Sequence, residues 1–429
     1  MTEYLKQAPM YSAAVSEQVR KTVSEMLLRI EREGIDAVRA YSRELDGWDP
    51  PSFFAGPDEI RAAEAEIDDE LRGHIAFAQQ QVRTFAEHQR ASMTDVEVQT
   101  LPGVTLGHRH VPIGNVGSYV PGGRYPMLAS AFMTTIVPKV AGVPRVVAMA
   151  PPRRGAGIHP AMLYAMATSG ADEILCLGGV QALAAVTFGV GDIEPVDFVV
   201  GAGNAYVAEA KRQLFGRVGI DLLAGPTEVL VIADGSADPE LVAADLLGQA
   251  EHGPTSPAIL ITTSRELGAA VIEAVDRLLA TTWPTAEVAG EAWREHGSVA
   301  VVEDDAAAVA LSDEYAPEHL EIQVEEGKLD WYLDNLRNYG SLFLGEQATV
   351  VYGDKAIGTN HVLPTMGAAR YTGGLWVGKF LKTCTYQRLT AEGTAQVAPA
   401  AAAISEAEML AGHALTATMR LERIGAARA

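Results

Sequence analysis

The chain has 429 residues, of which 48% are hydrophobic, and a formal net charge of −22. This length allows two or three domains with a buried core. The acidic balance argues against binding to a nucleic-acid backbone, which requires clustered Lys and Arg. We expect no membrane span, because no run of about 18 apolar residues is present, and a cytoplasmic location, because the N-terminus lacks the pattern of a signal peptide.

The elements follow in chain order from hydrophobic periodicity. Apolar residues at three- and four-residue spacing predict N-terminal helices within 12–46 and 57–95. Further along, β-branched runs predict strands at 146–150, 174–177, 198–200, 229–233, 257–263, 298–302, 320–323 and 341–344. Helical patterns separate these runs at 159–169, 180–188, 204–214, 237–251, 266–280 and 304–313. Strand and helix alternating at this pitch is typical of a parallel sheet.

The fold class that follows is α/β, with two Rossmann-like parallel-sheet domains, N-terminal helices and a helical C-terminal tail. The expected boundaries are a helical arm at 1–20, a discontinuous first domain at 21–122 and 230–372, a second domain at 123–229, and the tail at 373–429. The segment 377–425 is Ala-rich and reads as helical, with few long apolar runs of its own. Such a tail often packs on another domain or another subunit.

Glycine-rich turns follow two of the predicted strands. Gly201-Ala-Gly-Asn204 opens a helix as a dinucleotide fingerprint does, although Tyr206 stands where the third Gly is expected. Gly179 and Gln181 belong to a second such turn, and Arg124 lies in a third, Pro-Gly-Gly-Arg-Tyr. These turns are consistent with ordinary strand-to-helix connections. Together they favour an extended ligand such as a dinucleotide at the strand ends.

Several side chains are of the types that bind a metal ion. Gln249 and His252 are three residues apart and would share one face of a helix. Asp354 in a loop and His413 in the tail complete a candidate set. Two imidazoles with oxygen ligands suit zinc, and also manganese or cobalt. The alternative is that these are solvated polar residues, with His413 on a partly buried helix face.

Glu318 and His319 are the candidate acid and base. A neutral His is the usual proton acceptor near neutral pH, and a neighbouring carboxylate could activate water or support the His. Pro317 directly before them fits a helix N-terminus. A Glu at that position could instead be favoured only by the helix dipole.

Taken together, these residues resemble the histidinol dehydrogenase family, over roughly residues 20 to 420. The segments that carry the resemblance are, in family order, Gly117–Gly123, Gly203-Asn204, Ala224–Val229, Asp245–Gly253, Tyr315–Glu321 and Gly358–Thr365.

The resemblance implies NAD-dependent oxidation of a primary alcohol through an aldehyde to a carboxylate, with two NAD reduced. It also implies a homodimer with one zinc ion per site, in which the tail of each subunit completes the site of its partner. The implied roles are zinc ligation by Gln249, His252, Asp354 and His413, general base catalysis by Glu318 and His319, NAD contact by Tyr119, Gln181 and Asn204, and substrate contact by Thr227, His361 and Glu408.

Departures from the family pattern bear on the substrate. Thr227 stands where histidinol dehydrogenases usually have Ser, and the stretch 366–387 differs from theirs. These segments resemble the sulfopropanediol dehydrogenase branch, which oxidises 2,3-dihydroxypropane-1-sulfonate to 3-sulfolactate. A sulfonate requires cationic or amide donors. The available cations are Arg124, Arg370, Lys379 and Lys382, each of which could instead be a surface charge or a contact to a cofactor phosphate.

Three other functions stay open from the sequence. The chain could oxidise L-histidinol itself, or an unrelated polyol or amino alcohol. It could also be a non-catalytic family member that acts as a binding protein. The complete set of candidate metal and acid–base residues argues against the last, because a non-catalytic protein needs none of them.

Overall fold

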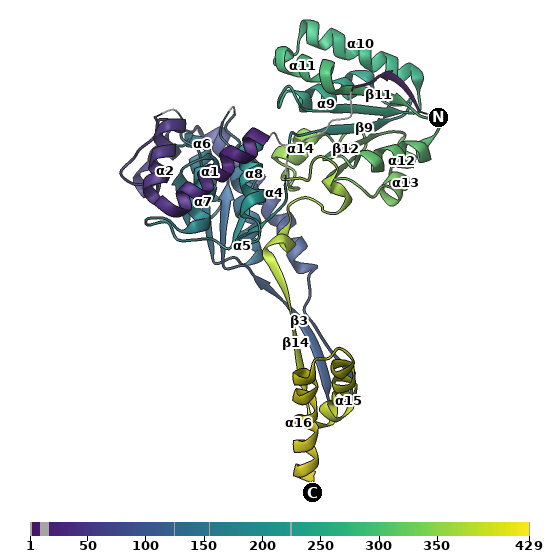
Figure 1. Cartoon of the computed structure of the whole chain (residues 1–429). Coiled ribbons are helices and arrows are strands. Elements are labelled where there is room, and N and C mark those ends of the chain that lie inside the picture. The colour runs from purple at the N-terminus through teal and green to yellow at the C-terminus, as the bar shows by residue number, and fades with distance from the viewer. Residues whose placement is uncertain (1, 9–16, 124, 154, 224, 429) are drawn as a thin grey trace.

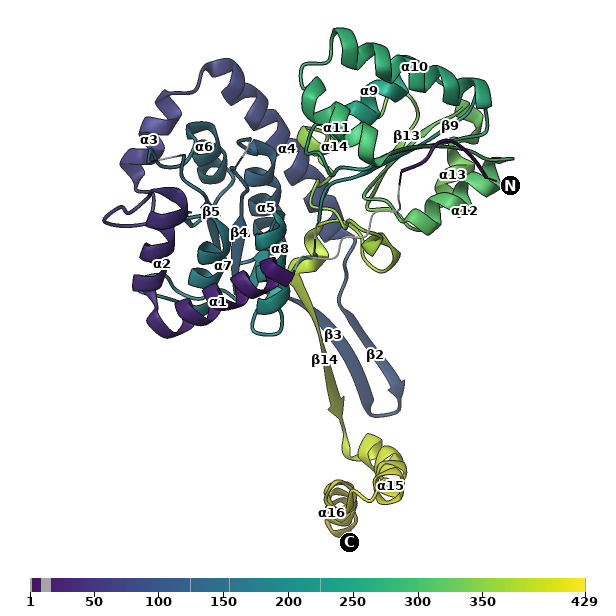
Figure 2. The ribbon, with the colours of Figure 1, turned by 45° about the horizontal axis from the view of Figure 1, so that its top comes forward.

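The computed structural model describes residues 2–8, 17–123, 125–153, 155–223 and 225–428. Two α/β lobes lie side by side, and a long ribbon projects from them with two helices at its far end (Figure 1). Figure 2 shows the same arrangement from a second direction. Within these residues, no helix has the length and apolar character that a membrane span requires.

The first lobe is built on a sheet of five parallel strands in the order β6-β5-β4-β7-β8. Its strands are β4 (Asn115–Tyr119), β5 (Arg145–Ala150), β6 (Glu173–Cys176), β7 (Phe198–Val200) and β8 (Gly219–Ile220). Helices cover both faces, which explains why the strands read as continuous apolar runs. The helices that lie between these strands in the sequence are α5 (Leu128–Ala141), α6 (Pro160–Thr168), α7 (Gly179–Phe188) and α8 (Ala205–Leu214).

The N-terminal helices pack on this first lobe. They are α1 (Glu17–Glu33), α2 (Ile35–Tyr41), the π-helical turn η1 (Ser42–Asp46), α3 (Pro57–Ala65) and α4 (Asp69–Ala91). Helix α1 contacts α7 and α8, while α3 contacts α6 and α4 contacts α5. The structure therefore groups 21–93 with the segment that contains β4 to β8. This differs from the predicted grouping of 21–122 with 230–372, because the apolar faces of these helices are buried against the first sheet.

The second lobe has a sheet of six strands in the order β1-β11-β10-β9-β12-β13, in which only β1 is antiparallel. Its strands are β1 (Glu3–Lys6), β9 (Val229–Ala233), β10 (Ala258–Thr262), β11 (Gly297–Val301), β12 (His319–Gln323) and β13 (Ser341–Leu344). The predicted helical arm at 1–20 is wrong at 3–6, which form this edge strand, and is helical at 17–20, which belong to α1, while 9–16 lie outside the described residues. Strand β1 pairs with β11 and so gains the hydrogen bonds of a sheet edge.

Helices cover both faces of the second sheet as well. They are α9 (Pro239–Ala250), α10 (Arg265–Thr281), α11 (Ala286–His296), α12 (Asp305–Tyr315), the short turn η2 (Glu326–Lys328), α13 (Leu329–Asn335) and α14 (Val350–Lys355). Both sheets share one topology, with a central pair of strands where the chain reverses its direction across the sheet. This pair is β4 and β7 in the first lobe and β9 and β12 in the second. The expected doubly wound α/β architecture is confirmed.

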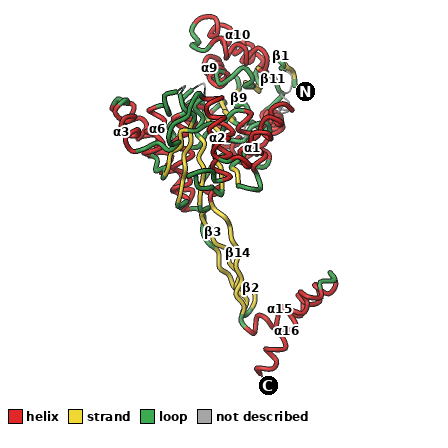
Figure 3. The backbone as a smooth tube through the Cα atoms, turned by 60° about the vertical axis from the view of Figure 1, so that its left-hand side comes forward, coloured by secondary structure: helices red, strands yellow, loops and turns green. Residues whose placement is uncertain are grey.

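The projecting ribbon was not anticipated from the sequence. Three antiparallel strands form it, and two helices follow (Figure 3). Its elements are β2 (Val96–Leu101), β3 (Val104–Pro112), β14 (Leu381–Leu389), α15 (Ala391–Ala407) and α16 (Ala411–Arg428). The turns η3 (Ala368–Arg370) and η4 (Val377–Phe380) come before β14 in the chain. The predicted helical reading of 377–425 is thus corrected at 381–389, which pairs along its whole length with β3. The tail after it is helical, as expected.

Candidate active site

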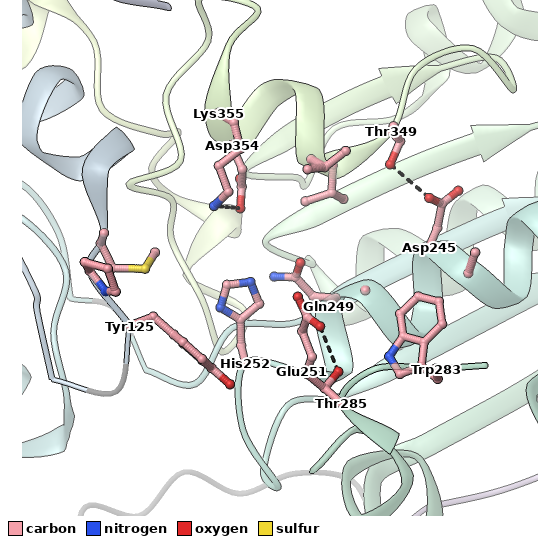
Figure 4. A pocket seen from close by; sticks show the side chains of 16 residues that line it. Tyr125, Asp245, Gln249, Glu251, His252, Trp283, Thr285, Thr349, Asp354 and Lys355 are labelled. Atoms are coloured by element: carbon pink, nitrogen blue, oxygen red, sulfur yellow. Dashed lines mark hydrogen bonds and ion pairs between the residues drawn. The ribbon is translucent and has the colours of Figure 1, made fainter. Parts of the chain in front are cut away.

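A cavity of about 460 Å³ lies where the two lobes meet. Residues 125–127, which follow β4, line it from the first lobe. From the second lobe it is lined by the C-terminal half of α9, the loop around Trp283 and helix α14 (Figure 4). The carboxyl ends of the first sheet therefore approach the amino ends of the second, since Gln249 near the end of α9 contacts Thr227 and His319, where β9 and β12 begin.

Three of the four predicted metal ligands line this cavity. They are Gln249 in the last turn of α9, His252 just beyond its end, and Asp354 in α14 (Figure 4). Burial lowers the pKa of His252 and so keeps its ring neutral, as a ligand must be. Burial opposes ionisation of Asp354, but the hydrogen bond and charge of His319 outweigh it and hold its pKa well below the usual range. The donor chemistry of these residues fits a zinc ion.

The chain does not bring the fourth predicted ligand to this cavity. His413 lies in α16 and Glu408 at the end of α15, both exposed, at the far end of the ribbon (Figure 1). Among the described residues, no three His, Cys, Asp or Glu side chains lie close enough to hold a metal ion. A tetrahedral zinc site takes four ligands, so Gln249, His252 and Asp354 would be one ligand short of the predicted set.

Glu318 and His319 are buried beside the cavity, at the start of β12. The expected helix start is wrong, because these residues begin a strand whose alternate residues Leu320 and Ile322 are buried in a hydrophobic core. Glu318 Oε2 accepts hydrogen bonds from Thr227 Oγ1 (2.5 Å) and from the backbone N–H of Glu228 (3.0 Å). Gln249 Nε2 donates to the same Thr227 hydroxyl, which links the predicted acid–base pair to the predicted metal ligands.

The imidazole of His319 has a defined orientation. Its Nδ1 donates to the carbonyl oxygen of Glu228 at 2.9 Å, and its Nε2 lies 3.3 Å from Asp354 Oδ1. Burial lowers the pKa of His319, but the nearby charges of Glu318 and Asp354 outweigh it and raise the pKa to about 9. A role as base at neutral pH therefore requires both charges to be reduced, as they would be with Glu318 protonated and the Asp354 carboxylate on a metal ion. Burial raises the pKa of Glu318 to about 7.

His361 lies close to these residues and connects the two lobes. Its Nδ1 donates to the backbone carbonyl of Asp354 at 3.1 Å, and its Nε2 is 2.7 Å from the hydroxyl of Ser130 in α5. Burial lowers the pKa of His361 to about 4, so the ring is neutral. A neutral ring with both nitrogens engaged holds α14 against the first lobe.

The three predicted NAD contacts lie at the carboxyl ends of the first sheet. Tyr119 ends β4, and its hydroxyl accepts from the N–H of Gly179 at 3.2 Å. Gln181 is in the first turn of α7 and donates to Asp46 Oδ2 at 2.9 Å. Asn204 caps α8 through its side-chain oxygen. Tyr119 and Asn204 flank the point where the strand order reverses, the usual site for a dinucleotide in such sheets, while Gln181 follows the edge strand β6.

The turn after β7 is fixed by a buried ion pair. Gly201 donates its N–H to Asp221 at 2.9 Å, and its carbonyl accepts from Lys211 Nζ at 2.8 Å. Lys211 and Asp221 are themselves paired and buried. Gly201 has φ of +122°, and a Cβ there would collide with the carbonyl oxygen of Tyr119.

Gly201→Ala is therefore expected to destabilise the fold by about 3 kcal/mol, the sum of backbone strain and steric overlap. The matched control is Gly216→Ala, which also has a positive φ but open space around its Cβ. It should cost only about 1 kcal/mol. Urea unfolding of both variants measures the difference, and equal losses would show that the close approach to Tyr119 is unimportant.

The predicted sulfonate contacts do not line the cavity where they are described. Arg370 is exposed and its Nε donates to the carbonyl of Gly367, while Lys379 Nζ donates to Thr372 Oγ1 at 2.7 Å. Arg124 lies outside the described residues, although its neighbour Tyr125 lines the cavity. The cation among the described lining residues is Lys355, which the sequence analysis missed. Its position directly after the predicted ligand Asp354 was the available signal.

Comparison with known proteins places the chain in a family. The profile of histidinol dehydrogenase matches residues 10–421. A histidinol dehydrogenase homolog of Shouchella clausii is 53% identical over 99% of this chain and 100% of that protein. The sulfopropanediol 3-dehydrogenase of Ruegeria pomeroyi is 47% identical over 98% of this chain and 96% of that protein.

The solved structures agree with this placement. Histidinol dehydrogenase from Elizabethkingia anophelis matches with a TM-score of 0.91 and 35% identity, over 98% of this chain and 95% of that chain. The chain therefore belongs to the histidinol dehydrogenase family, a family of NAD-dependent dehydrogenases.

Proposed function

We propose that the protein oxidises the primary alcohol of 2,3-dihydroxypropane-1-sulfonate through the aldehyde to 3-sulfolactate, with two NAD reduced per substrate. The observation that carries the proposal is the cavity itself, in which Lys355 lies beside the candidate metal ligands and the buried acid–base pair. The similarity to a protein named sulfopropanediol 3-dehydrogenase supports the same substrate. L-Histidinol is the alternative substrate, and the family name supports it.

A metal ion and a cofactor would supply part of the chemistry. A zinc ion held by Gln249, His252 and Asp354 would act as a Lewis acid that orients the substrate oxygens. NAD, bound near Tyr119, Gln181 and Asn204, would accept a hydride in each oxidation step. Both are proposals for this chain.

The chain's own residues would move the protons. His319, with Nδ1 fixed on the Glu228 carbonyl, is oriented to take the hydroxyl proton at Nε2. Glu318 has a pKa of about 7, raised by burial, so it can both hold and release a proton near neutral pH. It would activate the water that hydrates the aldehyde. A closed site keeps this reactive aldehyde from leaving between the two steps.

We also propose that the tail of a second copy completes the site. His413 and Glu408 lie on a ribbon that projects away from their own lobes (Figures 1 and 2). The cavity provides three of the four expected ligands, and an exposed His on a projecting arm of a second copy would provide the fourth. Glu408 of that copy would then contact the substrate.

Lys355 is the proposed partner of the sulfonate. Lys355→Met removes a charge-assisted hydrogen bond, so KM for the sulfonate should rise about 10- to 100-fold. The matched control is Lys379→Met, which removes a lysine that lies outside the cavity lining and should leave KM within about twofold. Steady-state NADH formation by both variants measures this. The opposite ranking would assign the anion contact to Lys379.

The substrate is tested by measuring NADH formation by zinc-loaded protein with the sulfonate and, in parallel, with L-histidinol. We expect kcat/KM to favour the sulfonate by on the order of 100-fold, because the Lys355 ammonium would attract a sulfonate and repel the cationic histidinol. A preference for L-histidinol would overturn the proposed substrate, and no NADH with either would revive the reading as a binding protein.

A further inference from the structure

A pair of carboxyl groups lies in contact next to the cavity and has no part in the proposed reaction. Asp245 comes from α9 and Glu321 from β12, and the two carboxyl groups lie within hydrogen-bonding reach of each other. Gln323 bridges them, because its Nε2 donates to Asp245 Oδ2 at 2.7 Å and to Glu321 Oε2 at 3.2 Å. Glu321 and Gln323 are buried, and Asp245 reaches the edge of the cavity (Figure 4).

The pair sits on the same elements as the proposed site. Glu321 is two residues after His319, so both side chains point to the same face of β12. Asp245 is four residues before Gln249, so both lie on one face of α9. The two periodicities therefore bring the carboxyl pair next to the acid–base and metal residues.

A third element is attached to the same pair. Glu321 Oε1 accepts from the backbone N–H of Val350 at 2.8 Å, and Asp245 Oδ1 accepts from Thr349 Oγ1 at 2.9 Å. Val350 is the first residue of α14, and Asp354 follows it by about one helical turn. The pair is thus the point at which β12, α9 and α14 are fastened together.

The pair cannot carry two negative charges at this location. In the described part of the chain, the hydrogen-bond partners of the pair are the Gln323 amide, the Thr349 hydroxyl and the backbone N–H of Val350, none of which is a basic group. Burial raises the pKa of Asp245, and burial together with the charge of Asp245 raises the pKa of Glu321. Two adjacent carboxyls in such surroundings retain one proton between them.

We propose that Asp245 and Glu321 share one proton and act as positioning residues, which hold α14 and thereby Asp354 in place against β12 and α9. The metal-binding consequence rests on the proposed function. The shared proton and the attachment of α14 do not.

The test compares an amide with a truncation at the same position. Glu321→Gln can still accept from Val350 through its oxygen and donate to Asp245 through its nitrogen, so it replaces the proton-bearing group. Glu321→Ala removes both bonds. A matched control is Glu209→Ala, which also removes a buried carboxylate, one that pairs with Arg212 in the first lobe.

Three readouts are made on the full chain. At neutral pH the infrared carbonyl band of protonated carboxylic acids should be weaker in Glu321→Gln than in the wild type, by the contribution of one group, because Glu318 with its pKa of about 7 absorbs in both proteins. Backbone hydrogen exchange at 349–355 should increase in Glu321→Ala but not in Glu321→Gln or Glu209→Ala. The Kd for Zn²⁺, measured by chelator competition, should rise about 10- to 100-fold in Glu321→Ala only.

The outcomes separate this inference from the proposed function. An unchanged infrared band in Glu321→Gln, or exchange in Glu321→Ala equal to that of the wild type, would overturn the inference. If the wild type binds no Zn²⁺ while the infrared and exchange results hold, the proposed metal site fails and the positioning pair stands. If backbone hydrogen exchange at 349–355 increased in Glu209→Ala as well, the effect would be a general destabilisation, and the positioning role would be overturned.

Discussion

Replacing His319 with glutamine should lower NADH formation by about 100- to 10,000-fold, the usual contribution of a positioned general base. Glutamine has nearly the same reach and can still donate to the Glu228 carbonyl, but it cannot take a proton. Because His319 is not one of the proposed metal ligands, the Zn²⁺ content should stay as in the wild type. Steady-state turnover and metal analysis of the same preparation measure the two effects.

The control for this variant is His74→Gln, which changes an exposed histidine of α4 and should leave turnover unchanged. Near wild-type turnover in His319→Gln would contradict the assignment of the base. Loss of zinc along with turnover would instead identify His319 as part of the metal site, which its 3.3 Å distance from Asp354 makes a meaningful alternative.

Mixing two inactive variants should restore activity if the tail of one copy completes the site of another. His319→Gln and His413→Ala are each expected to be inactive, because one lacks the base and the other the fourth ligand. After subunits are exchanged at random, half of the dimers are mixed and each has one intact site. Activity should therefore return to about a quarter of the wild-type value.

The position of His413 makes this mixing experiment decisive. It lies at the end of the ribbon formed by β2, β3 and β14, away from the cavity of its own chain (Figure 3). If His413 served its own chain, every mixed dimer would have two damaged sites and no activity would return. Two samples that are mixed without subunit exchange provide the baseline.

The two-sheet fold could be predicted from the sequence because its strands are buried on both faces. Runs such as 146–150 and 229–233 have no polar interruption, and they form β5 and β9 within one residue of the expected bounds. The ribbon could not be predicted in this way. Strand β2 does alternate apolar and polar residues over Val96-Glu97-Val98-Gln99, but it is exposed along its whole length, so this short alternation marks no buried face. The ribbon is closed by the pairing of β3 with β14, which joins segments far apart in the sequence.

The candidate site, like the fold, could be predicted from the sequence only in part. Gln249 and His252 could be paired from their spacing, but their approach to Asp354 and Glu318 depends on how α9, α14 and β12 meet, which only the fold determines. Pro317 favoured a helix start at Glu318-His319, whereas the strand predicted at 320–323 is the one that the structure confirms as β12. Arg370 and Lys379 were chosen by charge alone, and in the structure they bind other groups.

The most direct test of the proposed reaction is its stoichiometry. A limiting amount of 2,3-dihydroxypropane-1-sulfonate is converted to completion by zinc-loaded protein with excess NAD, and NADH and product are quantified together. The proposal predicts close to two NADH and one 3-sulfolactate per sulfonate, with no aldehyde released. One NADH with free aldehyde, or no reaction while L-histidinol is oxidised, would contradict it.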